Sequence, residues 1–327
     1  MPKFSEFPLL HSNTSIEDID KGSMLRPPIP RGWEPTGPES FRYEWDEKYV
    51  KNYNQKFSPW AFTRNCAAVL GHVQRNGKSE LMRDMADALV RVLEPHIQAI
   101  GLNRYVRNRF EYHYLHHKMK SPFFGAFMNN VTAYGLLYLY EATGVERHLL
   151  LADRLLMTSV DPVSVIPLSS DKGDGDFWLH EYVFMTDEHG PWADIQVSKI
   201  WSQARIYNGH IHALLPLMRM RAMTGSSDYD EPIEKAVATM AKWLPHQVYQ
   251  EKYFSYSPDM PIFPDYGQKR ALHLMEALSL LTGDPDITAA AENAKEIWPS
   301  IDGREKEVIA SAMSDANRDY QSHVSGK

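Results

Sequence analysis

Residues 133–144 read AYGLLYLYEATG, an apolar helical run that ends in a Thr-Gly pair. The same pattern recurs in residues 211–225 and in residues 272–283. Glycine accepts the left-handed backbone conformation that commonly follows the last turn of a helix. Each copy is followed by an acidic or serine-containing segment that opens another helical run. The sequence therefore predicts three helical hairpins, each of which turns at a Thr-Gly pair.

Helical hairpins cannot bury their apolar stripes alone, so neighbouring hairpins stack on one another. The three copies are unevenly spaced, which excludes a uniform solenoid. We expect a mainly α fold, an incomplete (α/α) toroid of helical hairpins with a few short β-strands near a cleft. Residues 1–40 are rich in Pro, Ser and Gly and are predicted to form an extended arm, with residues 41–327 as a single toroid domain.

Composition excludes several classes of protein. The net charge of −7 argues against nucleic acid as a partner, because nonspecific binding needs a broad basic surface. No window approaches 18 uncharged apolar residues, so no membrane span is predicted, and residues 1–23 lack the apolar core of a signal peptide. We therefore expect a cytoplasmic protein. The single cysteine, Cys66, excludes an internal disulfide.

We predict no metal site and no cofactor. Residues 171–176 carry aspartates at the first, fourth and sixth positions, which does not fit the calcium-binding EF-hand loop. His210 and His212 are two residues apart, whereas a zinc pair on a helix needs a spacing of three or four. Phosphate-binding glycine loops and dinucleotide fingerprints are missing from the sequence.

Two segments read as strands. Residues 103–115 alternate between apolar or aromatic side chains and charged ones, the pattern of a strand with one packed face. Arg107, Arg109 and His113 share its charged side, and we assign them to substrate binding because arginine can hold a carboxylate through two hydrogen bonds. Residues 177–184 are predicted to form a second, short strand.

Four motifs follow in order: FWLHEY at residues 177–182, YNGHI at 207–211, YFSYS at 253–257, and Asp265-Tyr266. Here the chain resembles the C-terminal catalytic domain of D-glucuronyl C5-epimerases, which act on heparosan-type polysaccharides. That family has a Glu-Tyr pair on a strand, an Asn-Gly that opens a long helix, a tyrosine on a later strand, and an Asp-Tyr before a histidine-containing helix. The resemblance covers roughly residues 100–285 and implies an α/α-toroid fold.

The resemblance implies a set of functional residues. It implies catalytic roles for Glu181, Tyr182, Tyr256 and Tyr266. We add Trp178, Asn208 and His210 from the same motifs to the substrate-binding residues. The chain departs from the family pattern in two places: a longer stretch separates the Glu-Tyr pair from Asn-Gly, and residues 267–270 (GQKR) replace the histidine-rich segment.

Inverting C5 of a uronate requires removal of the proton next to a carboxylate and return of a proton to the opposite face. The expected partner is therefore a carboxylated sugar or polysaccharide, and the arm could reach across a homodimer. Three alternatives remain open: a polysaccharide lyase, a hydrolase with paired carboxylates, and a non-enzymatic glycan-binding protein. On a regular strand Glu181 and Tyr182 would point to opposite faces, so both can serve one site only if the strand ends or bulges there.

Overall fold

The computed structural model describes residues 18–20, 57–108, 112–114, 117–119, 122–173, 175–185, 201–249, 251–259 and 267–311. In this part of the chain, the long helices form four consecutive hairpins. The hairpins are α3 (Pro59–Asn76) with α4 (Glu80–Leu93), α5 (Ala126–Thr143) with α6 (Glu146–Val160), α7 (Tyr207–Thr224) with α8 (Asp230–Trp243), and α9 (Gln268–Thr282) with α10 (Pro285–Ile301).

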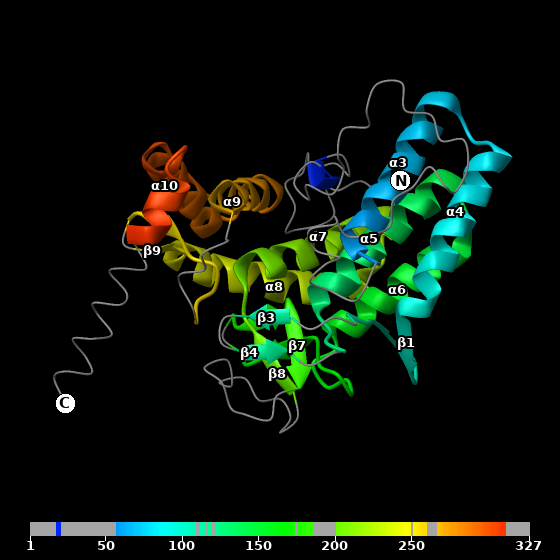
Figure 1. The fold of residues 1–327 in the computed structure, drawn as a ribbon, viewed down its shortest axis with the longest axis horizontal. Coiled ribbons are helices and arrows are strands. Elements are labelled where there is room, and N and C mark those ends of the chain that lie inside the picture. Colours follow the sequence, from blue (N-terminus) through cyan, green and yellow to red (C-terminus); the bar gives the residue numbers. More distant parts are fainter. Residues whose placement is uncertain are drawn as a thin grey trace.

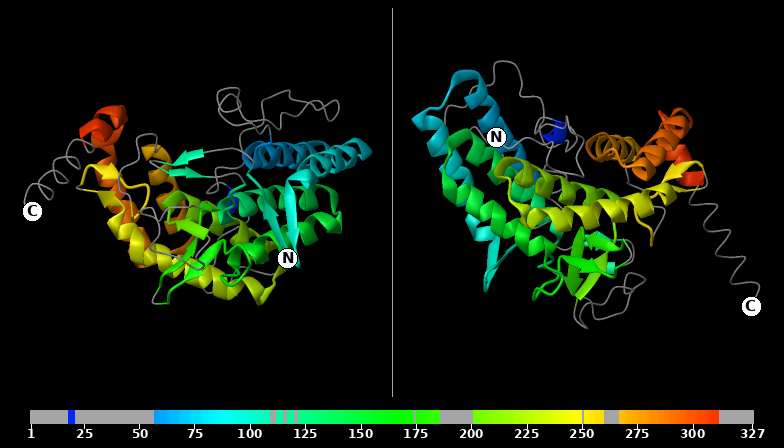
Figure 2. Two further views of the ribbon diagram at one scale, coloured as in Figure 1. Left: turned by 60° about the horizontal axis from the view of Figure 1, so that its bottom comes forward. Right: turned by 180° about the vertical axis from the view of Figure 1, so that it is seen from behind.

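The first helix of each hairpin packs against the first helix of the next, in the order α3, α5, α7 and α9. The second helices, α4, α6, α8 and α10, form an outer layer. The hairpins follow one another along an open arc, with α3 and α4 at one end and α9 and α10 at the other (Figures 1 and 2). This arrangement confirms the predicted fold class, a mainly α, incomplete (α/α) toroid.

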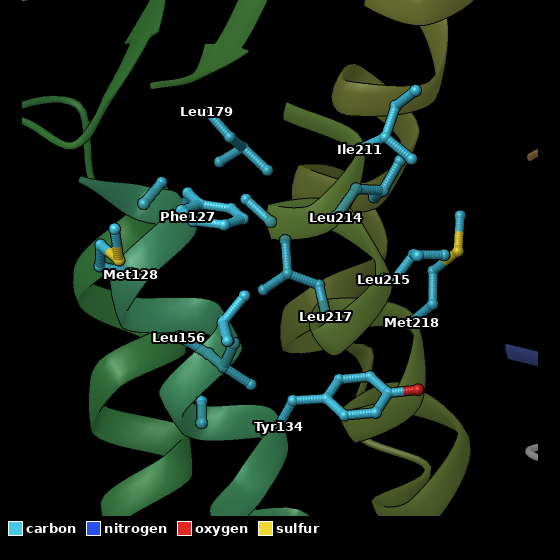
Figure 3. Close-up of a cluster of buried hydrophobic side chains, with 14 of the residues drawn as sticks. Phe127, Met128, Tyr134, Leu156, Leu179, Ile211, Leu214, Leu215, Leu217 and Met218 are labelled. Atoms are coloured by element: carbon cyan, nitrogen blue, oxygen red, sulfur yellow. The ribbon is translucent and has the colours of Figure 1, made fainter. Parts of the chain in front are cut away.

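Part of the core lies between α5 and α7, where Phe127 and Leu217 point into the space between the two helices (Figure 3). Nearly every residue of these two helices is buried, because α5 packs against α3, α6 and α7 and the start of α7 also contacts the strands. The outer helix α4 instead buries one stripe and exposes the other. Helices that are apolar on all sides belong in the interior of a fold, whereas amphipathic helices cover it.

The three Thr-Gly turns have the same construction. Each glycine is left-handed, with φ of 75° at Gly144, 72° at Gly225 and 61° at Gly283. Each threonine hydroxyl donates to the carbonyl four residues earlier and accepts the N–H two residues later, as Thr143 does with Leu139 and Val145. The recurring pair is therefore a structural signal that ends one helix and starts its partner.

The described strands form two-stranded antiparallel sheets in the connections between helices. These sheets are β1 (Ile97–Ile100) with β2 (Asn103–Val106), β3 (Tyr112–Tyr114) with β4 (His117–Met119), β5 (Ser169–Asp171) with β6 (Phe177–Leu179), β7 (Tyr182–Met185) with β8 (Trp201–Ala204), and β9 (Val248–Tyr249) with β10 (Tyr253–Phe254). The predicted single strand over residues 103–115 is wrong, since β2 pairs with β1 and β3 pairs with β4. The alternating pattern spans two hairpins.

Three residues of the predicted N-terminal arm, 18–20, are described and form a helical turn inside the arc (Figure 1). Ile19 is part of the core, and Asp20 accepts a hydrogen bond of 3.0 Å from the buried guanidinium of Arg219. The Tyr134 hydroxyl donates to the same carboxylate at 2.7 Å, and the Arg219 guanidinium also donates to Glu141 at 2.6 Å. This ion-pair cluster ties residues 18–20 to α5 and α7.

Candidate functional site

A bend at His180 and Glu181 separates β6 from β7, so the predicted continuous strand over residues 177–184 is wrong. The bend is held in place because the Ala126 N–H, at the start of α5, donates to the His180 carbonyl at 2.8 Å. The strict alternation of side chains is thereby interrupted between Glu181 and Tyr182. As a result, the Tyr182 hydroxyl forms a hydrogen bond with the Glu181 carboxyl group.

Two glycines make room for Glu181. A Cβ at Gly125, the residue before α5, would lie 1.9 Å from the Glu181 carbonyl oxygen. A Cβ at Gly209, in the first turn of α7, would lie 2.5 Å from Glu181 Oε2. The side-chain amide of Asn208 also donates to this Oε2, over 3.5 Å. Glu181 is therefore wedged between the starts of two inner helices, where the helix dipoles favour a negative charge.

Glu181 has the electrostatic character of a proton-transfer group. Burial raises the pKa of its carboxyl group to about 7, although hydrogen bonds from Tyr182 and Tyr256 and the nearby Arg270 act in the opposite direction. Burial disfavours a charged carboxylate, whereas donors and cations favour it. A carboxyl group with a pKa close to neutral pH exists in both protonation states there, which suits it to acid and base catalysis.

Tyr256 is positioned by backbone contacts to α7 and by its neighbours in the chain. The Tyr207 N–H, in the first turn of α7, donates to the Tyr256 carbonyl at 3.1 Å. The side chain of Gln268, at the start of α9, makes two hydrogen bonds to the backbone of Phe254. Tyr256 thus lies where α7 and α9 begin, and its hydroxyl reaches Glu181 from a different element than Tyr182 does.

The residues that the motifs predict for catalysis and substrate binding differ in how deeply they are buried. Trp178 and His210 are fully buried, whereas Glu181, Tyr182, Tyr256 and Asn208 keep between 5% and 8% of their surface exposed. His210 Nδ1 accepts the Leu179 N–H at 3.0 Å, and its Nε2 donates to the Ala236 carbonyl at 3.1 Å. Burial lowers the pKa of His210 to about 4, so the ring is neutral and ties β6 to α7 and α8.

The remaining predicted residues are not brought to Glu181 by a described contact. Arg107 follows β2, and its guanidinium donates to the Pro95 carbonyl at 2.6 Å. His113 lies in β3, paired with Lys118, and its side chain is outside the described part of the structure. Arg109 and Tyr266 lie outside the described residues altogether. Their roles stay predictions.

Sequence reasoning missed a second group of polar residues near Glu181. His212, on α7, is close enough to Arg270 and His273 of α9 for both to lower its pKa electrostatically, in addition to the larger effect of burial. Trp60 of α3 and Phe127 of α5 contact the His212 ring with centroid distances of 5.2 and 5.7 Å. The starts of all four inner helices therefore converge around His212 and Glu181. The sequence YNGHIH at residues 207–212 could have indicated this group, because His212 lies one helical turn after Asn208.

No group of three or more His, Cys, Asp or Glu side chains in the described ranges is arranged to hold a metal ion. None of the described helices combines the length and apolarity needed to cross a membrane.

Comparisons with known proteins yield solved structures alone. No known protein family matches the chain, and no curated protein matches it. The chain is similar to a sugar epimerase from a ruminal bacterium, with 13% identity, a TM-score of 0.49, and coverage of 88% of this chain and 72% of the other. It is also similar to cellobiose 2-epimerase from Bacillus thermoamylovorans B4167, with 12% identity, a TM-score of 0.47, and coverage of 86% and 71%. Similarity this low does not transfer an activity to this chain.

Proposed function

We propose that this protein is a carbohydrate epimerase that removes and returns the proton next to the carboxylate of a uronic acid unit. The observation that carries the proposal is Glu181, a buried carboxyl group with a pKa of about 7 that accepts hydrogen bonds from two tyrosine hydroxyls. The resemblance of the Glu-Tyr, Asn-Gly and YFSYS motifs to glucuronyl C5-epimerases selects the uronate as the substrate class.

Glu181 is assigned the removal of the C5 proton. Its carboxylate form is the base, and a pKa near 7 gives it more basicity than an exposed glutamate has while leaving it ionised in about half of the molecules at neutral pH. The proton passes from C5 to a Glu181 oxygen, and the electron pair of the C–H bond moves into the adjacent carboxylate of the sugar. The negative charge that develops there requires a cationic or hydrogen-bonding partner.

Tyr182 is assigned the return of a proton to the opposite face of C5. Its hydroxyl approaches Glu181 from β7, whereas Tyr256 approaches from the segment that follows β10. In this scheme the sugar enters between the two side chains, and the Tyr182 hydroxyl gives up its hydrogen bond to Glu181 and donates its proton to C5. Solvent then reprotonates the tyrosinate and takes up the proton that Glu181 removed. Tyr256 holds the Glu181 carboxylate through its hydrogen bond. An inversion requires two separate acid-base groups, here Glu181 and Tyr182. A single base would return the proton to the face from which it came.

The experiment incubates the full chain with a heparosan-type oligosaccharide in deuterium oxide and follows C5 by NMR. Deuterium at C5 together with iduronate and an unchanged chain length is the expected result. An unsaturated, ultraviolet-absorbing product would instead identify a lyase, and a new reducing end without deuterium would identify a hydrolase. Binding without any reaction would leave a glycan-binding protein, so each of these three results contradicts the proposal.

A further inference from the structure

His212 is a buried polar side chain without a hydrogen-bond partner among the described residues. It is 1% exposed, and neither of its ring nitrogens has a hydrogen-bond partner among the described residues. Burial lowers its pKa to about 3, so the ring is neutral at ordinary pH and offers one donor and one acceptor. Buried polar atoms normally find hydrogen-bond partners, because leaving one unpaired forfeits its hydrogen bonds to water without replacement. The imidazole nitrogens are therefore available to hydrogen-bond with a group from outside the helices.

Other unpartnered polar atoms lie on the same helix starts. His273 Nε2, on α9, is buried and has no hydrogen-bond partner in the described structure. The same is true of Asn208 Oδ1, in the first turn of α7. These atoms come from two different helices, so a distortion within one helix does not explain why both lack hydrogen-bond partners. A ligand that brings both acceptors and donors satisfies them together.

Arg270 supplies the charge of this group. It is exposed, lies in the first turn of α9, and acts electrostatically on both Glu181 and His212. A ligand that contacts Arg270 and His212 therefore lies next to the Glu181 carboxyl group. The start of α9 adds the partial positive charge of its unpaired N–H groups. Among sugar substituents, a carboxylate matches a guanidinium with two parallel hydrogen bonds.

We propose that Arg270, His212 and His273 form the subsite that binds the carboxylate of the sugar, directly beside Glu181. Arg270 pairs with the carboxylate oxygens, and the imidazole rings of His212 and His273 bind the same group or the adjacent ring hydroxyl. This inference rests on the proposed function, because the bound carboxylate is the one next to the carbon that loses its proton. The subsite selects uronates over neutral sugars and stabilises the negative charge of the intermediate.

The test compares binding of two simple ligands to the full chain by titration calorimetry: the methyl glycoside of glucuronic acid and that of glucose. The wild type is expected to prefer the glucuronide by about tenfold or more, since a hydrogen bond to a charged group contributes about 1.5–3 kcal/mol. Arg270→Gln is expected to abolish this preference, and Arg270→Lys to keep part of it. Lys269→Gln removes the same charge from the neighbouring exposed residue and is expected to keep the preference in full.

His212→Asn tests the buried member of the subsite. It is expected to weaken glucuronide binding by about tenfold while Arg270 still confers a preference over the glucoside, because the guanidinium still pairs with the carboxylate through two hydrogen bonds. Near-ultraviolet circular dichroism checks that each variant is folded. If a folded Arg270→Gln prefers the glucuronide as the wild type does, the subsite is wrong.

The subsite and the proposed function can fail separately. Deuterium exchange at C5 in the wild type, combined with an unchanged preference in Arg270→Gln, would overturn the subsite and leave the proton transfer by Glu181 standing. An Arg270-dependent preference for the glucuronide without any exchange would support the subsite and overturn the epimerase function.

Discussion

Glu181 and Gly209 are in such close contact that a Cβ at position 209 would lie 2.4 Å from the Glu181 Cβ. Gly209→Ala is therefore expected to displace the Glu181 carboxyl group from Tyr182 and Tyr256. We expect kcat/KM for epimerisation to fall by about 10²-fold, since a positioned acid-base group contributes 10²–10⁴-fold. The midpoint of the pH-rate profile should also move, because the contacts that set the pKa of Glu181 change.

Gly135→Ala is the matched control for that variant. Gly135 is also a helical glycine, and its Cβ would lie 2.9 Å from a ring atom of Phe62 rather than next to Glu181. It is expected to lower stability through crowding while the pH-rate profile keeps its midpoint. Equal shifts of the pH-rate midpoint in both variants would mean that Gly209→Ala loosens the fold in general and does not act through Glu181.

The tyrosines that contact Glu181 can be separated by removing one hydroxyl at a time. Tyr182→Phe is expected to lower epimerisation by about 10²-fold or more, while deuterium exchange with retained configuration falls less, because Glu181 still removes the proton.

Tyr256→Phe is expected to raise the pKa of Glu181 by removing a hydrogen bond to the carboxylate, which moves the rising limb of the rate profile to higher pH.

Tyr207→Phe is the control for both tyrosine variants, because the Tyr207 hydroxyl donates to the Trp243 carbonyl at 3.2 Å and not to Glu181. It is expected to change neither the epimerisation rate nor the pH profile. Wild-type epimerisation by a folded Tyr182→Phe, measured by NMR, contradicts the role assigned to that hydroxyl.

Stability should depend on pH through Glu181 even without a substrate. Its folded pKa, about 7, is raised above the ordinary value of 4.5, so its contribution is complete below pH 4.5 and is lost as pH rises through 7. Relative to Glu181→Gln, the wild type is expected to lose about 3 kcal/mol of unfolding free energy between pH 4 and pH 8. Urea titrations of both proteins at several pH values measure this difference, and a constant difference would show that Glu181 titrates normally.

The N-terminal segment should contribute to stability through Asp20. Asp20→Asn leaves the fully buried Arg219 without one of its carboxylate partners, and breaking a buried pair costs about 3 kcal/mol. Glu307→Gln breaks an exposed pair with Arg304 and is expected to cost less than about 1 kcal/mol. Equal losses in urea unfolding would mean that the segment is not anchored by this pair.

The fold was predictable from sequence because its signals are local. Each Thr-Gly pair ends a helix through contacts within a few residues, and the threonine hydroxyl and the glycine backbone need no distant partner. The strands were less predictable. Residues 103–115 alternate regularly, yet the segment belongs to two separate hairpins, because pairing with residues 97–100 and 117–119 decides where a strand ends.

The candidate site was predictable in part. The Glu-Tyr pair and Tyr256 were predicted from motifs. Because side chains alternate along a strand, Glu181 and Tyr182 were expected to meet only where the strand is interrupted, as it is here. Arg270 and His212 were not found, because their proximity depends on how α9 packs against α7. The fully buried position of His210 was equally hidden, since its partners Leu179 and Ala236 are distant in sequence.

In the proposed reaction, Glu181 is the group that removes the C5 proton. The measurement is the rate of deuterium incorporation at C5 of a glucuronate oligosaccharide as a function of pH, for the wild type and for Glu181→Gln. The wild-type rate is expected to rise with pH through about 7, as the carboxyl group loses its proton, and then to level off. Glu181→Gln is expected to lose at least about 10²-fold at every pH. A folded Glu181→Gln that exchanges at the wild-type rate with the same pH dependence contradicts the account.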